Sequence, residues 1–202
     1  MPKLKLTKTA LKSQRDALKQ FTRFLPTLQL KKQQLQMEMR RCQERLRENE
    51  EKENTLRRGI LAWLPLFGTE FDVKELRSFI RLEKVNTKLN NIAGVDVPVF
   101  ESAVFKVAEY NLFIVEPWFD DALEVIKELV ELRAEHDIIQ EQYNLIGNEL
   151  RVTTQRVNLF EKVKIPECRE NIRKIRIYLG DMDTSAVGRS KIAKRKVQEV
   201  TL

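Results

Sequence analysis

The side chains best suited to chemistry in this sequence are scattered and form no recognisable catalytic set. The single histidine, His136, could act as a general base, but it falls at an apolar-repeat position, where packing is the simpler interpretation. The acid-rich runs 48–53 and 120–121 could bind a metal, although such runs on helices usually face solvent. Tyr143 is at another repeat position and is expected to pack. We therefore predict a non-enzymatic chain with no catalytic residue, no metal ligand and no cofactor.

Nucleotide-binding and metal-binding motifs are also missing from the sequence. Neither G-x-x-x-x-G-K-[ST] nor G-x-G-x-x-G occurs, so the chain is not expected to hydrolyse ATP itself. Cys42 and Cys168 share no motif spacing with each other or with His136, which argues against a disulfide or a zinc site and favours a reducing, cytoplasmic setting. No apolar run is long enough to cross a bilayer, and the first residues lack a signal-peptide core. We expect no direct membrane insertion.

Basic charge is concentrated toward the two ends of the chain. The net charge is +7, with 16 basic and 7 acidic residues in 1–58, 6 and 11 in 59–125, and 15 and 12 in 126–202. The most biased stretch, 189–196, has five cations and no acid. Clustered cations can bind phosphates or an acidic protein surface, and the absence of stacking aromatics here favours the protein. The candidate partner-contact tail comprises Arg189, Lys191, Lys194, Arg195 and Lys196.

Apolar residues recur at alternating spacings of three and four in two long segments, which is typical of coiled-coil helices. The first helix is predicted over about 9–58, with Gly59 as its terminator and Pro26 kinking or dividing it. The second is predicted to open at Glu116-Pro117, and its apolar set falls out of phase after Phe160, which predicts a stutter or kink. The predicted coiled-coil seam includes Leu28, Leu35, Met39, Leu46, Leu56, Leu132, Ile139, Tyr143, Ile146, Leu150 and Val157.

The middle of the chain has a different pattern of apolar residues from the two helical segments. Residues 79–92 and 95–107 show partial alternation and many β-branched side chains, and turn-forming residues lie between them at 91–94. This pattern predicts a β-hairpin, preceded by a loop at 64–68 and a short helix at 73–79.

Together these segments predict a mainly α fold. Two long helices would form an elongated antiparallel coiled coil, with a small central β-hairpin and a short helix at one end. The predicted divisions are an N-terminal helical arm (1–58), a central knob (59–117), and a C-terminal helical arm with the basic tail (118–202).

Residues 7–18, 91–101 and 156–166 together resemble one family, the central-stalk D subunits of V/A-type rotary ATPases. Residues 91–101 (Asn-Ile-Ala-Gly-Val-Asp-Val-Pro-Val-Phe-Glu) are similar to its Gly-Val-x-Val-Pro segment, and residues 156–166 (Arg-Val-Asn-Leu-Phe-Glu-Lys-Val-Lys-Ile-Pro) to its Arg-Val-Asn-Ala-Leu-Glu…Ile-Pro signature. Residues 7–18 resemble the start of its long basic helix. The sequence departs from the family at Pro26 and in 182–189, which lacks the usual acidic and basic run.

The resemblance implies a central rotor shaft that couples ATP hydrolysis or synthesis to proton or sodium ion transport. Its implied partners are the catalytic and regulatory ring subunits, the small F subunit of the stalk and a membrane-ring connector. Its implied place is cytoplasmic, peripheral to the membrane. Two other functions stay open on the residues alone. A coiled-coil scaffold would not require the β-prone centre, and a basic nucleic-acid-binding coiled coil should bind DNA or RNA without ATPase subunits.

Overall fold

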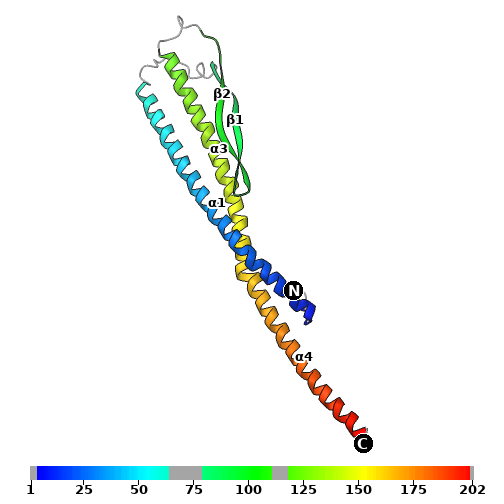
Figure 1. Cartoon of the computed structure of the whole chain (residues 1–202). Helices are drawn as coiled ribbons and strands as arrows, with labels where there is room; N and C mark the ends of the chain where they lie inside the picture. The colour runs from blue at the N-terminus through cyan, green and yellow to red at the C-terminus, as the bar shows by residue number, and fades with distance from the viewer. Residues whose placement is uncertain (1–3, 64–78, 111–117, 201–202) are drawn as a thin grey trace. The chain divides into compact units, whose positions relative to one another are not determined.

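The computed structural model of the chain describes residues 4–63, 79–110 and 118–200 (Figure 1). Two long helical segments and one hairpin make up the described chain, so the predicted mainly α fold is confirmed. The predicted loop at 64–68, most of the predicted short helix and the predicted start of the second helix lie outside the described residues. The elements are α1 (Lys8–Trp63), β1 (Ile80–Ile92), β2 (Val95–Val107), α3 (Phe119–Asn158), the π-helical η2 (Leu159–Lys164) and α4 (Ile165–Val200).

Helix α1 passes through both residues that were predicted to interrupt it. Pro26 lies inside the helix, so it does not divide the segment. The prediction that Gly59 ends the helix is wrong, because α1 continues to Trp63. Glycine lowers helix propensity by about 1 kcal/mol relative to alanine, which does not end a helix whose neighbours stay helical.

The predicted β-hairpin is confirmed. Strands β1 and β2 pair antiparallel from Ile80↔Val107 to Ile92↔Val95. The backbone turns through Ala93 (φ 51°) and Gly94 (φ 79°), a left-handed conformation that glycine adopts without steric cost. The Asn91 side chain stabilises this turn, since its Oδ1 accepts a 3.0 Å hydrogen bond from the Gly94 N–H.

The chain forms two compact units. We call Gln33–Arg151 the hairpin unit, and Met1–Lys32 with Val152–Leu202 the terminal unit. Inside the hairpin unit α1 and α3 are antiparallel, because Cys42 contacts Gln142 while Asn49 contacts Glu135. The main core cluster of this unit takes residues from α1, β2 and α3: Leu35, Cys42, Val97, Ile139 and Ile146.

The terminal unit pairs the start of α1 with the end of α3, η2 and α4. The rings of Phe21 and Phe160 are 5.0 Å apart, and the Asn171 Nδ2 donates a 3.4 Å hydrogen bond to Gln14 Oε1. These contacts also run in opposite chain directions. The buried apolar residues of this unit are Val157, Ile165, Cys168, Ile172 and Ile175.

The predicted phase break after Phe160 is present, and its cause is the π-helical turn η2. The Ile165 N–H bonds to the Phe160 carbonyl, five residues back, where an α-helix would bond four residues back. The wider turn absorbs one extra residue between Phe160 and Ile165. The helix therefore keeps its apolar face toward α1 on both sides of η2.

Candidate interaction surfaces

The predicted seam positions differ in how deeply they are buried and in whether they belong to the main core cluster. Leu56 and Leu132 of the hairpin unit are half-buried without belonging to its main cluster. In the terminal unit, Leu28 is half-buried and Val157 is buried. The remaining seven seam positions lie in the main cluster or pack against it: Leu35, Ile139 and Ile146 inside it, and Met39, Leu46, Tyr143 and Leu150 around it.

Polar residues occupy some buried positions between the helices. Asn49, only 3% exposed, donates a 3.2 Å hydrogen bond from Nδ2 to Glu135 Oε2. Among the described residues its Oδ1 has no partner. The nearly buried Glu53 carboxylate accepts a 2.5 Å hydrogen bond from the Arg57 guanidinium. Buried polar groups at helix–helix seams reduce stability while favouring one register, because other registers leave them unpaired.

Gln142 connects the hairpin to both helices, and sequence reasoning missed it. Its side chain is 2% exposed, its Nε2 donates to the Pro98 carbonyl of β2, and its Oε1 lies 4.0 Å from the Cys42 Sγ of α1. A glutamine beside a seam position gives no sequence signal, because most such residues face solvent.

Among the described residues, the side chains considered for catalysis or metal binding do not come together in one site. His136 is half-buried, with Nε2 3.8 Å from Glu50 and Nδ1 3.6 Å from Asp137, both longer than hydrogen bonds. Tyr143 accepts a 3.2 Å hydrogen bond from Gln43 on its hydroxyl oxygen. Within 4–63, 79–110 and 118–200, no group of His, Cys, Asp and Glu side chains could hold a metal ion. No helix in those ranges is long and apolar enough to span a membrane.

Burial raises the pKa of the Cys42 and Cys168 thiols. Because the folded state holds these protons to higher pH than the unfolded state, the stability they contribute is complete below the ordinary thiol pKa and falls as the pH rises through it. We expect the free energy of unfolding to decrease from pH about 7 to about 10, and to decrease less in Cys42→Ala/Cys168→Ala. Urea unfolding at several pH values measures this. Equal pH slopes in the two proteins would contradict it.

The predicted basic tail lies on α4. All five of its cations are exposed, and Arg195 is 3.6 Å from Glu199 one turn later. Four large apolar side chains on the C-terminal half of α4 are exposed as well: Met182, Val187, Ile192 and Val197.

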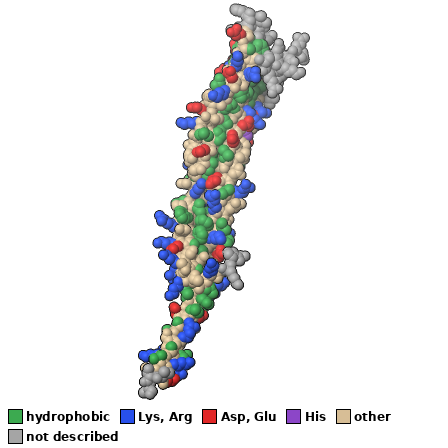
Figure 2. All heavy atoms as spheres, turned by 90° about the vertical axis from the view of Figure 1, so that its right-hand side faces the viewer, with side chains coloured by type: hydrophobic (Ala, Val, Ile, Leu, Met, Phe, Trp, Pro, Cys, Tyr) green, Lys and Arg blue, Asp and Glu red, His purple; other side chains and the backbone are tan. Residues whose placement is uncertain are grey.

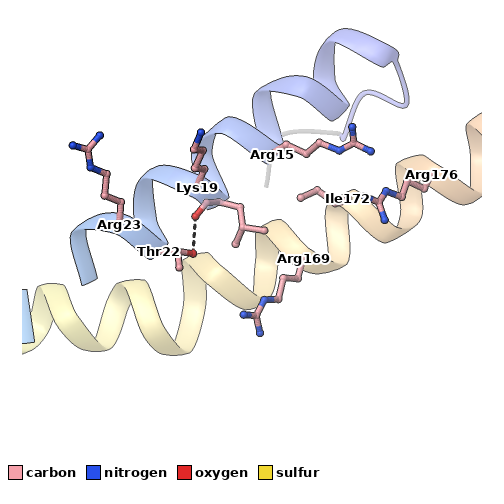
Figure 3. A pocket seen from close by; sticks show the side chains of 8 residues that line it. Arg15, Lys19, Thr22, Arg23, Arg169, Ile172 and Arg176 are labelled. Atoms are coloured by element: carbon pink, nitrogen blue, oxygen red, sulfur yellow. Dashed lines mark hydrogen bonds between the residues drawn. The ribbon is translucent and has the colours of Figure 1, made fainter. Parts of the chain in front are cut away.

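A second cationic surface, which sequence reasoning did not single out, lies in the terminal unit. On the face drawn in Figure 2, Lys and Arg side chains stand beside exposed hydrophobic ones. Between α1 and α4 there is an open groove of about 780 Å³, which we call the cationic groove. The groove is lined by Arg15, Leu18, Lys19, Thr22, Arg23, Arg169, Ile172 and Arg176 (Figure 3).

The periodicity of α1 explains the groove. Arg15, Lys19 and Arg23 are four residues apart, which places them along one side of a helix. That spacing was the signal available in the sequence. The same segment also carries Lys8 and Lys12, so the three groove cations do not stand out from its other basic residues.

Comparison with known proteins gives consistent matches along almost the whole chain. The family model that describes the D subunit of ATP synthase matches residues 10–195. A V-type ATP synthase D subunit of Borreliella burgdorferi is 44% identical over 194 residues, covering 96% of this chain and 95% of that protein. Proteins of the same name from Chlamydia caviae (32% identical, covering 97% and 94%) and Chlamydia trachomatis (33% identical, covering 97% of each chain) also match.

Proposed function

The chain belongs to the family of ATP synthase D subunits, and we propose that it is the central rotor shaft of a V/A-type ATPase. As a central-stalk component it is structural and non-catalytic. It sits in a multi-subunit ATPase complex, where it couples ATP hydrolysis or synthesis in the catalytic ring to ion translocation. The observation that carries this proposal is the family match over residues 10–195.

The packing between the helices suits a part that transmits torque. In each unit two antiparallel helices share a buried apolar face, and single helices would bend more easily than such a pair. The Asn49–Glu135 and Gln142–Cys42 contacts oppose sliding of α1 along α3, since a shift would leave buried polar atoms unpaired. A turning shaft of this kind biases nucleotide sites by making different contacts in each orientation.

The partners follow from the same role. We propose that the paired helices contact the ring of catalytic and regulatory subunits, that the small F subunit of the stalk binds beside them, and that a connector protein joins the shaft to the membrane ring. The chain would then be cytoplasmic and peripheral to the membrane. The excess of Lys and Arg in 1–58 and in the basic tail supports contact with acidic ring surfaces, and such contact should weaken as salt screens it.

Copurification tests this function. The tagged chain is expressed in its own host, and solubilised membranes are purified on the tag, with partners identified by mass and ATP hydrolysis assayed. We expect recovery of a large complex that hydrolyses ATP, while the purified chain alone does not. Recovery of the chain alone would favour a scaffold, and recovery with DNA or RNA would favour a nucleic-acid binder; either result would overturn the rotor function.

A further inference from the structure

The cationic groove combines two properties that point to one kind of occupant. Its floor is apolar, because Leu18 and Ile172 are among its lining residues, and Figure 3 shows Ile172 extending into the space between α1 and α4. Its rims are basic. Figure 3 shows Lys19 and Arg23 extending on one side and Arg169 on the other. Five cations line the groove and no carboxylate does.

Within the described part of the chain, the groove cations have no carboxylate partner in an ion pair. Among the described residues, no carboxylate lies within ion-pair distance of Arg15, Lys19, Arg23, Arg169 or Arg176. The nearest acid in sequence to Arg169 is Glu170, which bonds instead to Arg173 at 3.0 and 3.1 Å. The hydrogen bond to Arg173 lowers the pKa of Glu170, so the Glu170 carboxylate stays ionised and paired with Arg173. None of the five groove cations is therefore held in an ion pair by a carboxylate of the described residues.

The dimensions of the groove fit a protein segment better than a small anion. Arg15 and Arg23 are eight residues apart on α1, a span of about 12 Å at 1.5 Å per residue. One phosphate ion could not meet cations spread over that length, and it would gain nothing from the apolar floor. An amphipathic helix or strand with acidic flanks would place its apolar side on Leu18 and Ile172 and its carboxylates near the basic rims.

We propose that the cationic groove is the docking site for an acidic, amphipathic segment of another protein of the same ATPase complex. This proposal rests on the proposed function and adds a location and a partner chemistry to it. The groove is a different surface from the basic tail, whose cations lie further toward the C-terminal end of α4. The half-buried Leu18 on the apolar floor adds affinity, because Ile172 is already largely buried by the chain, and the long basic side chains supply orientation and salt sensitivity.

Charge reversal on both rims tests the proposal in the assembled complex. We expect Lys19→Glu/Arg169→Glu to reduce retention of the other ATPase subunits on the tagged chain by roughly tenfold at about 0.15 M salt. The neutral variant Lys19→Gln/Arg169→Gln should lose less. The matched control Arg40→Glu/Arg47→Glu changes the net charge by the same amount at exposed positions of α1 in the hairpin unit, and it should behave like the unaltered chain.

The outcomes separate the two proposals. If the unaltered chain recovers no ATPase subunits, the proposed function fails. If the unaltered chain recovers them and the rim variant retains them equally well, the docking site alone fails. Equal losses of ATPase subunits from the rim variant and from the control would also overturn the docking site, because the loss would then depend only on the total charge of the chain. Helical circular dichroism and urea unfolding of each variant distinguish lost docking from lost folding.

Photo-crosslinking supplies a test that charge reversal cannot. The photo-reactive residue in Leu18→p-benzoylphenylalanine should crosslink within the purified complex to a peptide that carries several Asp or Glu residues around apolar ones. A crosslinked peptide without acidic residues, or no crosslink to another protein of the complex, would overturn the proposal. Binding of a DNA oligonucleotide by the unaltered chain, lost on rim reversal, would instead assign the groove to nucleic acid.

Discussion

Ile146→Ala is expected to lower the free energy of unfolding by about 2–5 kcal/mol, the usual cost of removing a large aliphatic side chain from a packed core. Ile146 is fully buried and belongs to the cluster that joins α1, β2 and α3. The loss combines unburied apolar surface with a cavity that its neighbours cannot fill. Urea unfolding followed by helical circular dichroism measures the change.

The matched control for this substitution is Ile177→Ala, because Ile177 is also a helical isoleucine but is 55% exposed. We expect a change within about 0.5 kcal/mol there, as for most surface substitutions. If Ile146→Ala changed stability no more than Ile177→Ala, the cluster would not be the core of the hairpin unit.

Val97→Asp is expected to detach the hairpin from the helices, with a loss of about 3–5 kcal/mol for an uncompensated buried charge. Val97 is the only strand residue in the fully buried main cluster of the described chain. The Val97 side chain and the hydrogen bond from Gln142 to the neighbouring Pro98 carbonyl attach β2 to the helices there, and the partly buried Val95 also packs against the cluster. A carboxylate at position 97 would have to leave the core, and β2 would move with it.

Hydrogen exchange resolved by residue measures this detachment. Amides of β1 and β2 should exchange faster in Val97→Asp, while those of α1 outside the cluster change less. Leu89→Asp is the control, since Leu89 lies on β1 and is 74% exposed. Unchanged exchange in the strands of Val97→Asp would show that the hairpin is held by other contacts.

Periodicity made the helices and the hairpin predictable from sequence. Leu35, Ile139 and Ile146 repeat at coiled-coil spacing because burial on a helix has that period, and the β-branched stretches around the 91–94 turn alternate because strands do. Such patterns need only local information. The main exception was Gly59, where a residue typical of helix ends lies inside a helix that continues to Trp63.

The interactions that join elements were not predictable in the same way. The buried place of Gln142 depends on the Pro98 carbonyl, which is 44 residues away in sequence. The cationic groove needs α1 and α4 together, since Arg23 and Arg169 are both ordinary surface cations in their own helices. The buried place of Gln142 leaves no periodic pattern, and the four-residue spacing of Arg15, Lys19 and Arg23 marks only the α1 side of the groove. Both depend on pairings that only the folded chain supplies.

The π-helical turn has a consequence for how this chain tolerates changes in length. Each residue advances an α-helix by about 100°, so a one-residue deletion within Ile139–Val157 would rotate every later side chain away from α1. A deletion within Leu159–Lys164 would instead convert the wide turn to an ordinary one and leave Ile165, Cys168 and Ile172 facing inward. The turn can therefore lose one residue while the helix that follows it keeps its apolar side chains on the same face.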